Sequence, residues 1–125
     1  MSKHRILVVD DDKDVLLFLT RLLQKAGYTV PTAQDAAQAV IQAGREAPDL
    51  LLTDVTMPAG GGFSILDGLA KSATAYTVPV IVLTGADDSE LEARALAAGA
   101  TRVLRKPCDN AVLLGCIKTA LGDEG

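Results

Sequence analysis

The sequence predicts an α/β domain in which a parallel five-stranded sheet is covered by helices on both faces. Short apolar runs of strand length alternate five times with longer segments of helical period, and no linker interrupts the alternation. Several runs are apolar throughout, which is typical of parallel strands buried on both faces. The strands expected are Ile6–Val9, Thr29–Thr32, Leu50–Thr53, Val80–Leu83 and Val103–Arg105.

Each of the first four strands leads into a helical segment, and a fifth such segment follows the last strand. In the first, apolar residues between Val15 and Leu23 share one face, and Gly27 can supply a left-handed cap at its end. We expect the strand that contains Pro31 at an edge of the sheet, because proline has no N–H to donate to a neighbour. The other helices expected are Ala36–Ala43, Phe63–Leu69, Leu91–Ala98 and Ala111–Leu121.

Length, charge and hydropathy exclude several classes of protein. The 125 residues are 49% hydrophobic, which suits one domain with one core, and we expect residues 1–125 to form a single domain without an output domain. The net charge of -4 and the lack of a basic run argue against direct nucleic-acid binding. The apolar stretches are too short for a membrane span, and no signal peptide is recognisable. A cytoplasmic location is therefore expected.

Polar residues stand at the carboxyl ends of four of the predicted strands. In an open parallel sheet these ends meet at one rim, and ligands bind there near the point where strand order reverses. The first strand is followed by three acidic residues, the third by one, the fourth by a threonine and the fifth by a lysine. The residues expected at this rim are Asp10, Asp11, Asp12, Asp54, Thr84 and Lys106.

The carboxylates of this set favour a divalent cation. Carboxylates held within a few ångströms repel each other unless a cation lies between them. Mg²⁺ prefers oxygen ligands, commonly one or two protein carboxylates, and Asp11 and Asp54 meet that need. The ammonium of Lys106 and the hydroxyl of Thr84 suit the oxygens of a transferring phosphoryl group.

Each acidic residue also has a purely structural interpretation. The aspartates after the first strand can cap the helix that follows, and for Asp12 this is the interpretation that we favour. Asp54 can be a turn residue before Met57 and Pro58. A carboxylate cluster, a further carboxylate, a hydroxyl and a lysine at the ends of four different strands together favour a functional site.

The sequence resembles the response-regulator receiver family from Ile6 to about Leu121. The resemblance implies a (βα)₅ doubly wound fold with the flavodoxin-like strand order 2-1-3-4-5, which agrees with an edge position for the Pro31 strand. The segments that carry the resemblance, in family order, are ILVVDDD at 6–12, DLLLTDVTMP at 49–58 with Gly62, VIVLTG at 80–85 and Lys106–Pro107.

The resemblance also implies a role for each site residue. Asp54 is the expected phosphorylation site, with Thr84 as the switch hydroxyl and Lys106 as the partner of the phosphoryl group. Asp11 and Asp54 are expected to bind Mg²⁺ directly, and Mn²⁺ is an expected substitute. The last two expected metal contacts are Asp10 through water and the backbone carbonyl of Thr56.

The implied protein is a signalling switch rather than a separate enzyme. Asp54 takes a phosphoryl group from phosphohistidine of a histidine kinase or histidine phosphotransfer protein in a two-component phosphorelay, and hydrolysis resets it. The fourth helix, fifth strand and fifth helix form the implied surface for a downstream protein target. Val103 stands where the family often places Tyr or Phe, so an aromatic readout is absent.

Three other functions fit parts of the pattern. A haloacid-dehalogenase-type phosphatase opens with a DxD motif like 10–12, but it wants Thr or Val where Asp14 stands. Phosphomonoester turnover discriminates this class. A flavodoxin-like electron carrier needs a hydroxyl- and glycine-rich phosphate loop, and the aspartates at 10–12 would repel that phosphate. A degenerate receiver that binds partners without phosphate is the third alternative.

Overall fold

A computed structural model describes residues 4–54, 78–85, 89–97, 100–106 and 108–122. The expected helix Phe63–Leu69 lies outside these residues. The strands are β1 (Ile6–Val9), β2 (Thr32–Ala33), β3 (Leu50–Thr53), β4 (Val80–Thr84) and β5 (Arg102–Arg105). The helices are α1 (Lys13–Lys25), α2 (Ala36–Glu46), α4 (Ser89–Ala97) and α5 (Asn110–Leu121).

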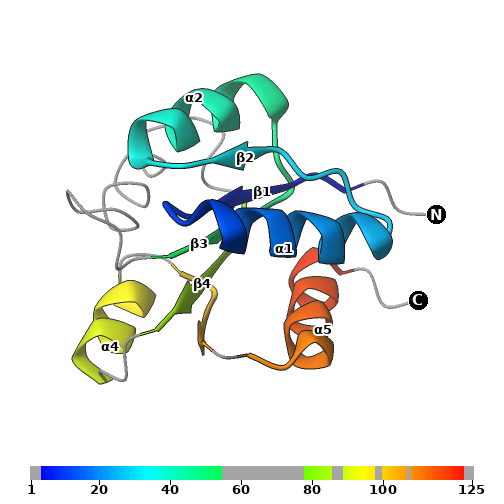
Figure 1. Ribbon diagram of the computed structural model, residues 1–125. Coiled ribbons are helices and arrows are strands. Elements are labelled where there is room, and N and C mark those ends of the chain that lie inside the picture. The colour runs from blue at the N-terminus through cyan, green and yellow to red at the C-terminus, as the bar shows by residue number, and fades with distance from the viewer. Residues whose placement is uncertain (1–3, 55–77, 86–88, 98–99, 107, 123–125) are drawn as a thin grey trace.

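The strands form one parallel sheet in the order β2-β1-β3-β4-β5. Helices α1 and α5 lie on one face of the sheet, and α2 and α4 pack on the other (Figure 1). Because β1, β3 and β4 are covered on both sides, every residue of these three strands is buried. The predicted doubly wound α/β fold and its strand order are confirmed.

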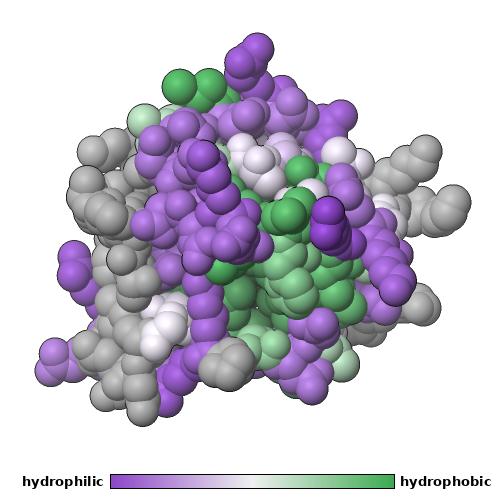
Figure 2. Space-filling model, viewed as in Figure 1, coloured by the Kyte–Doolittle hydropathy of each residue, from purple (hydrophilic) through white to green (hydrophobic). Residues whose placement is uncertain are grey.

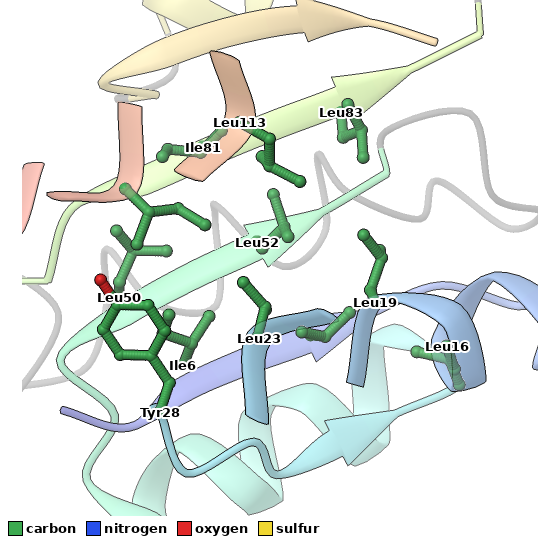
Figure 3. Close-up of a cluster of buried hydrophobic side chains, with 12 residues drawn as sticks. Ile6, Leu16, Leu19, Leu23, Tyr28, Leu50, Leu52, Ile81, Leu83 and Leu113 are labelled. Carbon is green, nitrogen blue, oxygen red and sulfur yellow. The ribbon is translucent and has the colours of Figure 1, made fainter. Parts of the chain in front are cut away.

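The core has two parts, one on each face of the sheet. On the face of α1 and α5, leucines of α1 pack against alternate strand residues and against α5, and Tyr28 closes one end (Figure 3). On the face of α2 and α4, small residues such as Ala39, Ala43 and Ala95 let the helices approach the sheet closely. Side chains of one strand alternate between the two parts, as Ile6 and Leu7 do.

The expected strand at Thr29–Thr32 is wrong in its extent, although its edge position is confirmed. The β2 strand covers only Thr32–Ala33, and Thr29 forms an isolated bridge to Arg5. The Pro31 carbonyl accepts a hydrogen bond from the Val8 N–H at 3.0 Å. Proline has no N–H to donate back to β1, so the ladder is interrupted at this residue.

The helix ends follow from capping residues. The Asp12 carboxylate accepts a hydrogen bond from the Asp14 N–H at 2.9 Å, which confirms Asp12 as the cap of α1. After α1, Gly27 adopts a φ of 100°, as expected. Helix α2 instead has its C-cap at Ala47, whose φ of 46° puts a residue with a Cβ in the left-handed region. Glycine adopts this conformation easily and asparagine and aspartate tolerate it, but it is unfavourable for the other residues.

Replacing Ala47 with glycine should therefore stabilise the protein. We expect Ala47→Gly to raise the free energy of unfolding by about 0.5–1 kcal/mol, because glycine adopts the left-handed conformation without strain. Urea unfolding followed by circular dichroism measures the change. The control is Ala93→Gly in the exposed middle of α4, where the same substitution should cost about 1 kcal/mol. Equal loss of stability in both variants would contradict the prediction.

Within the described ranges, no helix has both the length and the apolar character needed to cross a membrane.

Candidate functional site

Four polar residues meet at the carboxyl rim of the sheet. Asp10 follows β1, Asp54 follows β3, Thr84 ends β4 and Lys106 follows β5. The neighbouring strands β1 and β3 pair Val9 with Thr53, so Asp10 and Asp54 leave the sheet side by side. Both aspartates are buried, at 3% and 7% exposure, and Thr84 is buried beside them at 2%. The four residues thus lie at the same rim of the sheet, as the strand ends predicted.

Lys106 joins the two buried carboxylates. Its Nζ lies 3.0 Å from Oδ2 of Asp10 and 3.2 Å from Oδ2 of Asp54. Its backbone N–H donates to the Thr84 carbonyl at 2.8 Å, which holds the start of the lysine against the end of β4. One ammonium between two carboxylates leaves a single net negative charge. This contact between Lys106 and Asp10 was not predicted, although the opposite charges at two strand ends were a signal for it.

The pKa values of Asp10 and Lys106 reflect this arrangement. Burial raises the pKa of Asp10 above 3.8, and the charge of Asp54 adds to the effect, while the Asp12 N–H and Lys106 act against it. Burial by itself lowers the pKa of Lys106, but hydrogen bonding to Asp10 and the two carboxylate charges raise it above 10.5 overall. The ionised Asp10 is therefore disfavoured in the folded protein, and the protonated Lys106 is favoured.

Asp10→Asn should stabilise the metal-free protein at neutral pH. A raised pKa means that the folded protein holds the Asp10 proton more tightly than the unfolded chain does. The contribution of Asp10 to stability is then greatest below pH 3.8 and is lost as pH rises through the higher folded pKa. We expect a gain of about 1 kcal/mol at pH 7, the usual scale of a single-site change.

The measurement is urea unfolding in EDTA between pH 3 and pH 8. The gain in stability should be small at the acidic end and grow as pH rises. Asp35→Asn is the control, because Asp35 is an exposed cap of α2 and asparagine caps a helix equally well. A loss of stability in Asp10→Asn at pH 7 would mean that its ion pair with Lys106 outweighs the cost of burial.

The remaining predicted metal ligands are Asp11 and the backbone carbonyl of Thr56. Asp11 is exposed at the rim, next to the buried Asp10. Thr56 lies outside the described residues. Among the residues that the structure does describe, no three His, Cys, Asp or Glu side chains lie close enough to form a metal cluster. The donors present at the rim are carboxylate oxygens with an excess of negative charge, and this chemistry fits a hard cation such as Mg²⁺.

An apolar hollow next to the site was not predicted. It has a volume of about 420 Å³, and Phe18 of α1, Leu113 of α5 and Lys106 are among the residues that line it. Figure 2 shows apolar surface over α1 and beside α5 on this face. Phe18 is 55% exposed because it lies off the buried stripe of α1. A large aromatic residue outside the buried stripe was the sequence signal for it.

The sequence is similar to known regulators along most of its length. Residues 6–118 match the response regulator receiver domain family. The chain is 36% identical over 117 residues to protein PilH of Pseudomonas aeruginosa, covering 94% of this chain and 97% of PilH. It is 39% identical over 125 residues to the transcriptional regulatory protein PrrA of Mycobacterium tuberculosis, covering all of this chain but 53% of PrrA. The chain thus spans about half the length of that relative.

Solved structures agree with the sequence comparison. The chemotaxis protein CheY4 of Vibrio cholerae superposes with a TM-score of 0.90 at 30% identity, covering 96% of this chain and all of CheY4. The fold of the described residues and the match over residues 6–118 therefore lead to one conclusion. This chain belongs to the response regulator receiver family of two-component signalling systems.

Proposed function

We propose that Asp54 accepts a phosphoryl group from phosphohistidine of a partner protein, with Mg²⁺ bound beside it. The observation that carries the proposal is the position of Lys106, whose ammonium lies within 3.2 Å of both buried carboxylates. A cation at this place can also meet the oxygens of a phosphoryl group on Asp54. Thr84 is the last residue of β4, and its hydroxyl is the second donor to those oxygens.

The transfer itself requires little covalent chemistry from the chain. A carboxylate oxygen of Asp54 attacks phosphorus in line, an O–P bond forms and the N–P bond to the donor imidazole breaks. The electron pair of that bond stays on the imidazole nitrogen. Lys106 and Thr84 offset the negative charge of the equatorial oxygens. Attack of water on the phosphorus of the acyl phosphate releases inorganic phosphate and returns Asp54 to its carboxylate, so the switch resets itself without a separate enzymatic activity.

The metal would be held by oxygen ligands at this rim. Asp11 and Asp54 are the proposed direct carboxylate ligands, Asp10 the ligand through water, and Thr56 the carbonyl ligand. When bound, Mg²⁺ supplies positive charge that offsets both the acidic cluster and the phosphoryl oxygens. Asp10 and Asp54 keep their carboxylates oriented through Lys106 and, for Asp10, through the Asp12 N–H at 3.0 Å.

The proposed partners approach from two sides. The phosphohistidine protein contacts the hollow between α1 and α5, because Lys106 lines this hollow and its Nζ lies 3.2 Å from Oδ2 of Asp54. A histidine kinase or a histidine phosphotransfer protein fits this role. The downstream protein binds the face formed by α4, β5 and α5. A single domain over residues 1–125 and a cytoplasmic location stay predictions.

Intact mass spectrometry tests the proposal. The protein is incubated with acetyl phosphate and Mg²⁺, with Mn²⁺, or with EDTA. We expect a single phosphoryl adduct with either metal and none with EDTA. An adduct that forms equally in EDTA would overturn the metal requirement, and no adduct under any condition would favour a receiver that works without phosphate. In a separate incubation with p-nitrophenyl phosphate and Mg²⁺, the absence of phosphomonoester turnover separates this function from that of a phosphatase.

A further inference from the structure

We infer that Arg105 transmits the state of the acceptor site to α4 through its ion pair with Glu92. This inference rests on the proposed phosphorylation of Asp54. In this chain Val103 stands where an aromatic side chain is expected, so a structural change at Asp54 needs another route to α4. The ion pair joins Nη2 of Arg105 in β5 to Oε2 of Glu92 in α4 at 3.4 Å.

Arg105 occupies a special place between two site residues. The register of β4 and β5 pairs Arg105 with Thr84, and the next residue in the chain is Lys106. The Lys106 N–H donates to the Thr84 carbonyl at 2.8 Å, so the backbone of Arg105 is enclosed by this hydrogen bond and the strand ladder. A displacement of the Thr84 or Lys106 backbone toward new phosphoryl oxygens is therefore carried to the backbone of Arg105.

The side chain of Arg105 lies on the face of the sheet that α4 covers. Along β5, Val103 packs against the core part beneath α2 and α4, and Leu104 packs against the part beneath α1 and α5. Because side chains alternate along a strand, Arg105 leaves the sheet on the same face as Val103. Its contact with Glu92 lies on that face, in the first turns of α4. The link therefore runs from the rim of the sheet to α4 without an aromatic side chain.

The size of the effect is limited by exposure. The side chains of Arg105 and Glu92 are 49% and 40% exposed, so water screens their attraction. The C-terminal half of α4 is held more firmly, because Ala95 is fully buried against the sheet. An exposed pair can shift the balance between two positions of the N-terminal turns of α4 by about two- to fivefold. This is sufficient for a response that hydrogen exchange can measure.

The experiment compares hydrogen exchange of α4 before and after phosphorylation. Wild type, Arg105→Gln, Glu92→Gln and the double variant are incubated with acetyl phosphate and Mg²⁺, and intact mass gives the phosphorylated fraction of each sample. Exchange is then followed in peptides that cover residues 89–97. Arg102→Gln is the matched control, because it removes the same charge from the exposed opposite end of β5.

We expect phosphorylation to change α4 exchange in wild type and in Arg102→Gln. In Arg105→Gln and Glu92→Gln, the change should be smaller by about two- to fivefold although the phosphorylated fraction is preserved. The double variant should equal Arg105→Gln, because Glu92 acts in this link through Arg105. A full α4 response in phosphorylated Arg105→Gln, or additive losses in the double variant, would overturn the inference. A wild type without adduct would instead overturn the proposed function, and the inference with it.

Discussion

Asp54→Asn is expected to abolish the phosphoryl adduct completely. The asparagine side chain has nearly the shape of aspartate, but its neutral amide oxygen is too weak a nucleophile to attack phosphorus. The variant should remain folded, because the substitution removes one of two buried negative charges while Lys106 keeps its contact with Asp10. Intact mass after incubation with acetyl phosphate and Mg²⁺ should show only the unmodified chain.

The matched control for this prediction is Asp12→Asn. Asp12 lies two residues after Asp10 but is exposed and caps α1, a role that asparagine fills equally well. This control should acquire the adduct as wild type does. A persistent adduct on Asp54→Asn would assign the nucleophile to another residue. Loss of the adduct in both variants would show that the acidic rim as a whole, rather than Asp54, is required.

Lys106→Met should have the second largest effect, on stability and on transfer together. Methionine keeps the length of the side chain but removes the charge between two buried carboxylates. Loss of one partner from a buried ion pair costs about 3–5 kcal/mol, and since the lysine side chain is 29% exposed we expect about 2–4 kcal/mol. Without its ammonium, phosphoryl transfer to Asp54 should slow by about 10²–10³-fold.

Urea unfolding in EDTA checks the stability, and the rate of adduct formation checks the transfer. The raised pKa of Lys106 means that its stabilisation is fully present below pH 10.5 and is lost only as pH rises through the folded value. The deficit of Lys106→Met should therefore be present at pH 7 and shrink at acidic pH, where Asp10, whose pKa is raised, takes up a proton. Adding Asp10→Asn should restore part of the stability.

The control is Lys118→Met, which removes an exposed lysine in the last turn of α5. It should cost less than about 1 kcal/mol, because it loses only a favourable charge at a helix end. Equal stability of Lys106→Met and wild type at pH 7 would show that water, rather than the lysine, compensates the two carboxylates.

Much of the fold follows from local pattern. Runs such as Ile6–Val9 are apolar throughout because both faces of a parallel strand are buried, so their burial is predictable from composition alone. Asp12 was predictable as a cap because its carboxylate needs only the N–H groups two and three residues ahead. Asp54, Thr84 and Lys106 were predictable at one rim because the carboxyl ends of parallel strands always meet at one edge of the sheet.

Other features depend on which distant groups come together. Pro31 indicated an edge strand, but the length of β2 is decided by the hydrogen bonds that its register with β1 allows. The contact of Lys106 with Asp10 joins residues 96 positions apart, and the ion pair of Arg105 with Glu92 depends on how α4 lies over β5. Periodicity and propensity describe a residue and its neighbours along the chain. Partners between elements are selected by packing, which brings charges within reach in three dimensions and buries some of them.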